Sequence, residues 1–259
     1  MNWIEALILG IVQGLTEFLP ISSTGHLYLG RKMFGLQEAG LFLDTMLHIG
    51  TFIALVVFYK DILFKVVRNP FSKLSFLLIV GTIPAVIAGL MFDDFFDEIS
   101  VTGSTIGWEF LLTGTFLWFA DRLKNGVKKI EDISFADSLF IGCFQAFAIF
   151  PAVSRSGMTI AGALMRKIEK ETAAYFSFLL SIPAIFGAIV LQSSKLISHQ
   201  NVEIGFFPLL VATMSAAFFG YAAVKWMIRF VKNHSLKLFA SYVWILGFFI
   251  IVMQGLDIF

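Results

Sequence analysis

Two short polar runs interrupt an otherwise apolar chain, and their side chains could do chemistry together. The first run and its flank supply an amide, a carboxylate, three hydroxyls and an imidazole: Gln13, Glu17, Ser22, Ser23, Thr24 and His26. The second supplies an amide, a guanidinium and three hydroxyls: Gln145, Ser154, Arg155, Ser156 and Thr159. An ionisable group at membrane depth costs about 2.5–3.5 kcal/mol on insertion scales, so this clustering indicates a functional site.

The residue types favour a phosphate site. A single Arg offers a planar fork of donors, and a helix that starts after each run would point its free N–H groups and its dipole at an anion. Gly25 and Gly157 permit close backbone approach to such a ligand. A Ser beside a Glu and a His is a candidate nucleophile with acid–base help. A pure ion channel would have little use for that combination.

The composition predicts a membrane protein. The chain has 259 residues, of which 58% are hydrophobic and 14% are charged, and its mean hydropathy is +0.85. An average soluble domain carries about 25% charged residues. The net charge of +1 argues against a nucleic-acid partner, and the single cysteine excludes a disulfide framework. The apolar runs are continuous, so we expect helices rather than a barrel, in a single membrane domain over residues 1–259.

Six stretches are long and apolar enough to cross a bilayer, which takes about 20 residues. They are approximately Leu41–Tyr59, Leu74–Phe92, Ser104–Ala120, Glu171–Gln192, Gly205–Phe230 and Lys237–Gly255.

Four further apolar stretches flank the polar runs in two pairs, Asn2–Leu19 with Thr24–Phe34, and Phe135–Phe150 with Gly157–Met165. The stretch Thr24–Phe34 would rise only about 16 Å, against a bilayer core of about 30 Å. We therefore expect two re-entrant helix–loop–helix pairs, each of which returns to the side it entered from. Their polar loops must then be buried in protein or line a wet cavity.

The two halves of the chain resemble each other. Gln13 precedes Gly25 by the same spacing as Gln145 precedes Gly157, and Gly89 matches Gly220 at nearly the same offset. We interpret residues 1–122 and 135–256, approximately, as repeats of a re-entrant pair followed by three spans. Because three is odd, the second copy would be inverted, an arrangement that places broken helices and polar ligands near the midplane.

The basic residues predict an orientation. With six spans and two re-entrant pairs, all but four of the 19 Lys and Arg residues fall in loops on one side, which marks the cytoplasmic face. The exceptions are Arg31, Lys32, Lys195 and Arg155. Both termini are then expected on the outer side, from which the first polar run would also enter.

The residues of the two runs resemble a known family. The segment from Gln13 to His26, Gln-Gly-Leu-Thr-Glu-Phe-Leu-Pro-Ile-Ser-Ser-Thr-Gly-His, is similar to the first signature of the undecaprenyl-pyrophosphate phosphatases, or bacitracin-resistance proteins. Pro-Ala-Val-Ser-Arg-Ser-Gly-Met-Thr, from Pro151 to Thr159, resembles their second signature. The resemblance covers nearly the whole chain, and the two signatures together are highly specific.

The resemblance implies a role for each matching residue. Ser23 would attack the terminal phosphorus, Glu17 would orient or deprotonate it or help to hold a divalent cation, and Arg155 would bind the pyrophosphate. His26 would be an acid–base partner, or in some schemes the nucleophile itself. The cation would be Mg²⁺ or Ca²⁺. Phosphate contacts are expected from Gln13, Ser22, Thr24, Ser154, Ser156 and Thr159.

The chain departs from the family pattern at two positions. Ala152 stands where the family usually has Gly, so a methyl group would tighten that turn. Gln13 stands where the family has Glu or Gln, so a second carboxylate is missing. Structural roles also stay open: Glu17 and Arg155 could form a buried ion pair, and His26 could be a structural histidine. His48 could line the cavity, but we expect it to be an interior histidine whose polar atoms are satisfied.

The function implied is hydrolysis of a polyprenyl pyrophosphate to the monophosphate and inorganic phosphate in the bacterial cytoplasmic membrane, recycling the lipid carrier for cell-wall synthesis. The alternative is a transporter or flippase of a phosphorylated polyprenyl lipid, because inverted repeats are also transporter architecture. Transport needs an anion site but no nucleophile, so Ser23 discriminates between the two.

Overall fold

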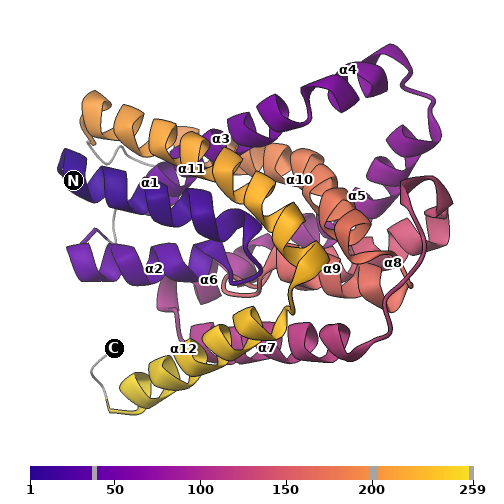
Figure 1. The fold of residues 1–259 in the computed structure, drawn as a ribbon. Helices are drawn as coiled ribbons and strands as arrows, with labels where there is room; N and C mark the ends of the chain where they lie inside the picture. The colour runs from indigo at the N-terminus through magenta and orange to yellow at the C-terminus, as the bar shows by residue number, and fades with distance from the viewer. Residues whose placement is uncertain (37–39, 199–203, 257–259) are drawn as a thin grey trace.

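The computed structural model describes residues 1–36, 40–198 and 204–256, and these are helical almost throughout. The described helices are α1 (Trp3–Phe18), α2 (Ser23–Phe34), α3 (Gly40–Phe58), α4 (Lys60–Arg68), α5 (Lys73–Met91), α6 (Asp93–Thr102), α7 (Ile106–Arg122), α8 (Phe135–Phe147), α9 (Arg155–Met165), α10 (Lys170–Ser198), α11 (Phe206–Asn233) and α12 (Lys237–Gly255) (Figure 1). A 3₁₀ turn, Ile130–Asp132, precedes α8.

Five described helices are long and apolar enough to cross a membrane: α3, α5, α10, α11 and α12. They correspond to five of the six spans expected from the sequence. The remaining expected span, Ser104–Ala120, forms α7, which has 17 residues and carries Glu109 on its buried face. By length and composition, α7 is not among the described helices that could cross a membrane.

The helices beside the polar runs start at serine caps. Ser22 accepts a hydrogen bond from the Gly25 N–H at 3.3 Å, and Ser154 accepts one from the Gly157 N–H at 3.1 Å. Such side chains satisfy backbone donors that the first helical turn leaves free. Each cap follows a short non-helical link, so each polar run becomes the tip of a helix–loop–helix pair, α1–α2 and α8–α9.

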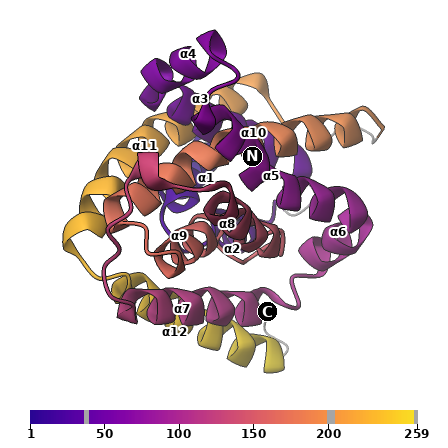
Figure 2. The same cartoon turned by 90° about the vertical axis from the view of Figure 1, so that its right-hand side faces the viewer.

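The two pairs lie inside the molecule, and longer helices surround them. In the end-on view of Figure 2, α1, α2, α8 and α9 occupy the centre, while α3, α5, α7, α11 and α12 lie around them. Packing crosses between the halves of the chain, because α1 packs on α11 while α8 packs on α5. In addition, α7 packs along α12, and α3 contacts both α10 and α11.

Glycines permit the closest of these helix contacts. A Cβ on Gly10 of α1 would lie 2.5 Å from the Ala212 carbonyl oxygen of α11, and one on Gly142 of α8 would lie 2.4 Å from the Gly81 carbonyl oxygen of α5. Small residues allow helix backbones to approach closely in a membrane, where packing rather than hydrophobicity drives association.

Asp137 links the two helices of the second pair, α8 and α9, at the end opposite their tip. Its buried carboxylate accepts hydrogen bonds from Lys128 Nζ at 2.9 Å and Arg166 Nε at 2.7 Å, as well as from the hydroxyl and N–H of Ser134. Burial alone would raise the pKa of Asp137, but these donors outweigh it and hold the pKa well below its usual range. The carboxylate thus joins the start of α8, the end of α9 and the linker before them.

Helix α4 was not expected from the sequence. It extends away from the bundle (Figure 1), and none of its residues is buried. Its exposed side chains include Phe64 and Val67 beside Lys65 and Arg68, and the Arg68 guanidinium lies 4.2 Å from the centre of the Phe64 ring.

Candidate active site

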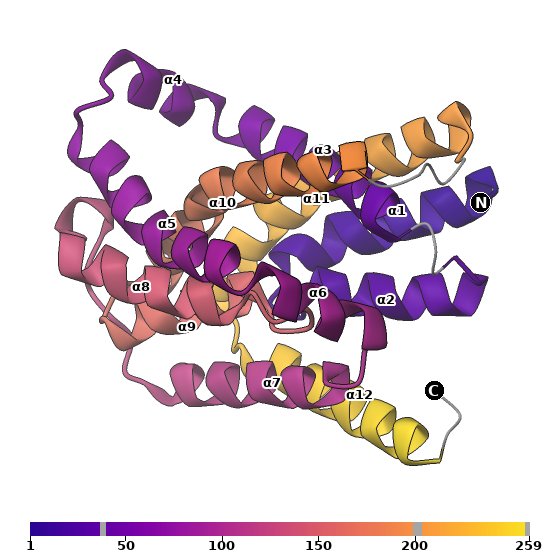
Figure 3. The same cartoon turned by 180° about the vertical axis from the view of Figure 1, so that it is seen from behind.

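The tips of the two helix pairs meet in the interior. Viewed from behind, α1 and α2 reach the middle of the molecule from one end, and α8 and α9 reach it from the other (Figure 3). The Ser22 hydroxyl donates to the Pro151 carbonyl oxygen at 3.3 Å, and the Ser156 hydroxyl donates to the Leu19 carbonyl oxygen at 3.0 Å. Each tip therefore holds the other through a serine side chain.

Glu17 is the centre of the polar contacts between the tips. Its Oε2 accepts a hydrogen bond from the Ser23 hydroxyl at 2.5 Å and another from Gln13 Nε2 at 3.1 Å. Its Oε1 accepts from Arg155 Nη2, which forms an ion pair across the tip-to-tip contact. His48 Nε2 lies 3.9 Å from Oε2. Glu17, Gln13 and Ser23 are buried, and the Arg155 side chain is 15% exposed, so solvent screens the ion pair little.

Two buried polar atoms at this centre have no hydrogen-bond partner in the described part of the chain. One is Arg155 Nη1, a donor, and the other is Gln13 Oε1, an acceptor. Unsatisfied buried polar atoms are rare in native proteins and call for an explanation such as a bound ion or ligand. A ligand carrying anionic oxygens would satisfy the Arg155 donor.

Ser22 holds an uncommon backbone conformation beside the Ser23–Glu17 contact. Its φ of 68° lies in the left-handed region, which non-glycine residues seldom adopt. Its carbonyl oxygen accepts from the ring Nδ1 of His26 at 2.6 Å, and its side chain caps α2. Such strain costs about 1–3 kcal/mol and occurs often at functional sites.

The His26 ring is directed to α12 rather than to Glu17. Because a carbonyl oxygen only accepts, Nδ1 donates to Ser22, and Nε2 is left to pair with the Tyr242 hydroxyl at 2.8 Å. The Tyr242 ring stacks on the imidazole with centroids 5.7 Å apart, and Phe110 meets it edge-on. Both ring nitrogens are therefore engaged with groups other than Ser23.

The second tip uses its hydroxyls within the protein. The Ser154 and Ser156 hydroxyl oxygens lie 3.3 Å apart. Thr159 contacts the Ser177 hydroxyl of α10 at 2.6 Å, one turn further into α9. Gln145 Nε2 donates to the Gly81 carbonyl oxygen at 3.4 Å. In the first tip, Thr24 lies half-buried in the first turn of α2.

Ala152 fits its turn without backbone strain. Among the described non-glycine residues, positive φ values occur at Ser22 and Lys167 alone, so Ala152 does not need the freedom of glycine. Its methyl group is fully buried and faces Gly25 of the other tip. The extra methyl therefore fills space between the tips.

His48 lies in the interior, as expected, and its Nδ1 donates to the Asp44 carbonyl oxygen at 2.7 Å, while its Nε2 faces the Glu17 carboxylate. The structure also adds two residues that the sequence analysis did not single out. On α7, Glu109 accepts from the Ala152 N–H, and Thr113 accepts from the Ser154 N–H at 3.1 Å. A carboxylate inside an apolar stretch was a usable signal for Glu109, because such residues are functional candidates by default.

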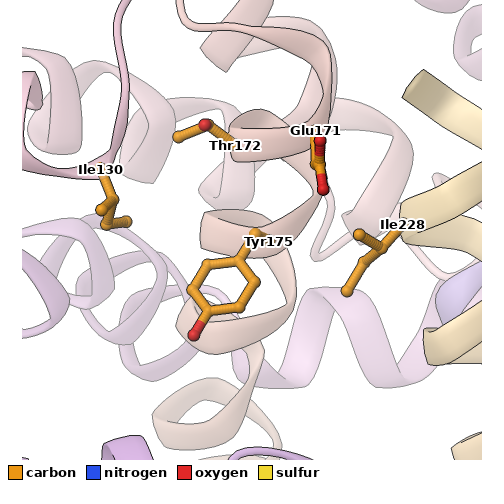
Figure 4. A pocket seen from close by; sticks show the side chains of 5 residues that line it. All are labelled: Ile130, Glu171, Thr172, Tyr175 and Ile228. Atoms are coloured by element: carbon orange, nitrogen blue, oxygen red, sulfur yellow. The ribbon is translucent and has the colours of Figure 1, made fainter.

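A shallow hollow of about 200 Å³ lies elsewhere, among Ile130, Glu171, Thr172, Tyr175 and Ile228 (Figure 4). Glu171 there also pairs with Lys232. None of the lining residues belongs to the Glu17 site, so the hollow is separate from it.

The fold and the site define a class: an all-helical, multi-pass membrane protein with a buried serine–carboxylate–arginine site between two helix tips. Comparison with known sequences gives the family. Residues 6–249 match the family described as bacitracin resistance protein BacA, and the chain belongs to it.

Relatives extend over the full length of the chain. It is 64% identical over 259 residues to undecaprenyl-diphosphatase 3 of Bacillus cereus, covering all of both chains. It is 47% identical to the undecaprenyl-diphosphatase of Carboxydothermus hydrogenoformans, over 98% of each chain. An undecaprenyl-diphosphatase of Halothermothrix orenii is 36% identical over 99% of this chain and all of its own.

Proposed function

We propose that the protein is a membrane phosphatase that hydrolyses undecaprenyl pyrophosphate, or a similar polyprenyl pyrophosphate, to the monophosphate and inorganic phosphate. The names of its full-length relatives support this activity. The observation that carries it is the Ser23 hydroxyl bonded to Glu17, beside an arginine with a free buried donor. A nucleophile, its base and a hydrogen-bond donor that can bind an anion thus lie together in one buried site.

In the first step, Ser23 Oγ attacks the terminal phosphorus while its proton passes to Glu17, to which it is already hydrogen-bonded. The bond from that phosphorus to the bridging oxygen breaks, and its electron pair leaves with the polyprenyl monophosphate. The serine is then phosphorylated. Glu17 releases its proton to the departing phosphate.

In the second step, Glu17 takes a proton from a water molecule that attacks the phosphoserine, and the proton returns to Ser23 Oγ as the bond to phosphorus breaks. Inorganic phosphate leaves and the enzyme is restored. Arg155 Nη1 would bind phosphate oxygens throughout, and a donor aimed at charge that develops in the transition state lowers the barrier.

The contacts of His26 favour Ser23 as the nucleophile. The imidazole is held between the Ser22 carbonyl oxygen and the Tyr242 hydroxyl, whereas the Ser23 hydroxyl faces a base directly. We assign His26 the task of holding the carbonyl of Ser22, and through it the strained turn that presents Ser23.

A divalent cation, Mg²⁺ or Ca²⁺, fits the donors at the site. The described residues contain no group of three or more His, Cys, Asp or Glu that could hold one alone. Mg²⁺ commonly takes one or two carboxylates and completes its shell with substrate phosphates and water. Glu17 and the unpartnered Gln13 Oε1 would supply the protein oxygens. The cation would neutralise pyrophosphate charge.

We further propose that α7 completes a set of six spans, that α1–α2 and α8–α9 are re-entrant, and that the two halves form an inverted repeat. The matched packing of α1 on α11 and of α8 on α5 supports the repeat. In this arrangement the protein lies in the bacterial cytoplasmic membrane with both termini outside. The polyprenyl tail stays in lipid while the pyrophosphate enters between the tips.

The test is phosphate release from a polyprenyl pyrophosphate by detergent-purified protein with added Mg²⁺ or Ca²⁺. Ser23→Ala and Arg155→Ala should each lower release by at least about a hundredfold. Ser194→Ala changes an exposed serine near the C-terminal end of α10, and as the matched control it should retain full release. If wild-type protein moves the lipid between leaflets of a vesicle but releases no phosphate, the protein is the transporter instead.

A further inference from the structure

One face of α7 holds the backbone of the second tip. Glu109 and Thr113 lie one helical turn apart, and both are buried. Glu109 Oε2 accepts from the Ala152 N–H, while Thr113 Oγ1 accepts from the Ser154 N–H at 3.1 Å. The N–H groups of Ala152 and Ser154, in the loop before Arg155, thus both donate to side chains of α7.

Glu109 has no cationic partner within the described residues, although its side chain is buried. Its other oxygen, Oε1, accepts from the Thr105 hydroxyl at 2.5 Å. A buried carboxylate is costly unless hydrogen bonds satisfy it, so its placement needs a compensating use. The donors that satisfy it are the loop backbone and the threonine that precedes α7.

Phe110, which lies between Glu109 and Thr113 on α7, contacts the first tip. A Cβ on Gly25 would lie 2.6 Å from Cζ of Phe110, and the His26 ring meets the Phe110 ring edge-on with centroids 5.4 Å apart. Helix α7 therefore touches both tips from one side. It can set the distance between the groups that the tips carry.

We propose that Glu109 and Thr113 are positioning residues that fix the loop of Ala152–Ser154, and through it the Arg155 guanidinium relative to Glu17 and Ser23. The inference rests on the proposed phosphatase function. Arg155 is the first residue of α9, directly after the Ser154 cap, so a shift of the loop moves its side chain. A displacement of about 1 Å in a positioned group can cost about a hundredfold in rate.

The test compares isosteric and conservative variants. Thr113→Val keeps the shape but removes the acceptor, and it should lower kcat for phosphate release at least tenfold with KM changed less than about threefold. Thr113→Ser and Glu109→Gln keep an acceptor and should stay within about threefold of wild type. Thermal unfolding in detergent identifies any variant that fails to fold.

A double-variant cycle separates positioning from general support. In the background of Arg155→Lys, whose amine cannot reproduce the guanidinium geometry, Thr113→Val should cost less than about threefold, because the group it positions is gone. Equal losses in both backgrounds, or full activity of Thr113→Val, would overturn the inference. Absence of release by wild-type protein would instead reject the proposed function itself.

Discussion

Glu17 is the residue on which the site depends, because three kinds of partner converge on its two oxygens. The Arg155 ion pair and the Ser23 hydrogen bond coexist, so the sequence alternatives of a structural ion pair and a catalytic carboxylate are compatible. Because Arg155 pairs with Oε1, Oε2 stays with the Ser23 hydroxyl and can accept its proton in the proposed mechanism. The unpartnered Nη1 leaves Arg155 able to bind a second anion.

Gln13→Glu tests the cation proposal at this scale. The variant adds a second carboxylate beside Glu17, and more ligand charge tightens binding of Mg²⁺ or Ca²⁺. We expect the cation concentration for half-maximal phosphate release to fall about three- to tenfold.

Gln192→Glu is the matched control, since it adds a carboxylate on α10 that can still accept from the Thr45 hydroxyl, as Gln192 Oε1 does. It should leave the cation midpoint unchanged. Equal midpoints for wild type and Gln13→Glu would show that residue 13 does not face the cation.

At the scale of helices, the glycine contacts determine how the central pairs pack. Gly142→Ala would place a Cβ 2.4 Å from the Gly81 carbonyl oxygen, and backbone cannot move aside cheaply. Gly89→Ala, in α5, meets no atom within 4 Å. We expect the first to destabilise by about 1–3 kcal/mol, as overpacking does, and the second to be neutral or slightly stabilising. Thermal unfolding of both variants in detergent measures the difference, and equal melting temperatures would contradict this packing.

Asp137 gives the second helix pair a pH dependence. Its pKa is depressed, so its contribution to stability is full above the unfolded value of about 3.9 and is lost as the pH falls below it. Asp137→Asn should therefore cost about 1.5–3 kcal/mol from pH 5 to 8, and less below pH 4. Melting curves of wild type and Asp137→Asn across pH measure this difference in stability. A difference that persists unchanged at pH 3 would mean that the carboxylate is not the group responsible.

The sequence predicted elements better than contacts. Long apolar runs located five spans, and proline-bounded polar runs located both tips, because burial and turn chemistry are local. The direction of the His26 ring could not be predicted from the sequence, because its partner Tyr242 lies far along the chain. The proximity of His48 to Glu17 was hidden for the same reason, because it exists only once α1 and α3 pack together. Glu109 was not singled out, although a carboxylate inside an apolar stretch is visible in the sequence.

At the scale of the whole molecule, the site is shared between the halves of the chain. Glu17 and Ser23 come from the first half and Arg155 from the second, while α1 and α8 each pack on a helix of the other half. We expect residues 1–122 and 135–256, expressed separately, to release no phosphate. Co-expressed halves should associate and recover measurable release. Stable folding of either half alone, seen as a cooperative thermal transition, would contradict the cross-packing.

Crossed packing also determines when the protein can finish folding in the cell. Helix α1 leaves the ribosome first, yet its partner α11 begins at Phe206. At about 5–20 residues per second, α1 waits about 10–40 s for that partner. For most of this interval its polar face, with Gln13 and Glu17, has neither α11 nor Arg155 to cover it. The insertion machinery must therefore shelter the nascent first pair from lipid until the last fifth of the chain arrives.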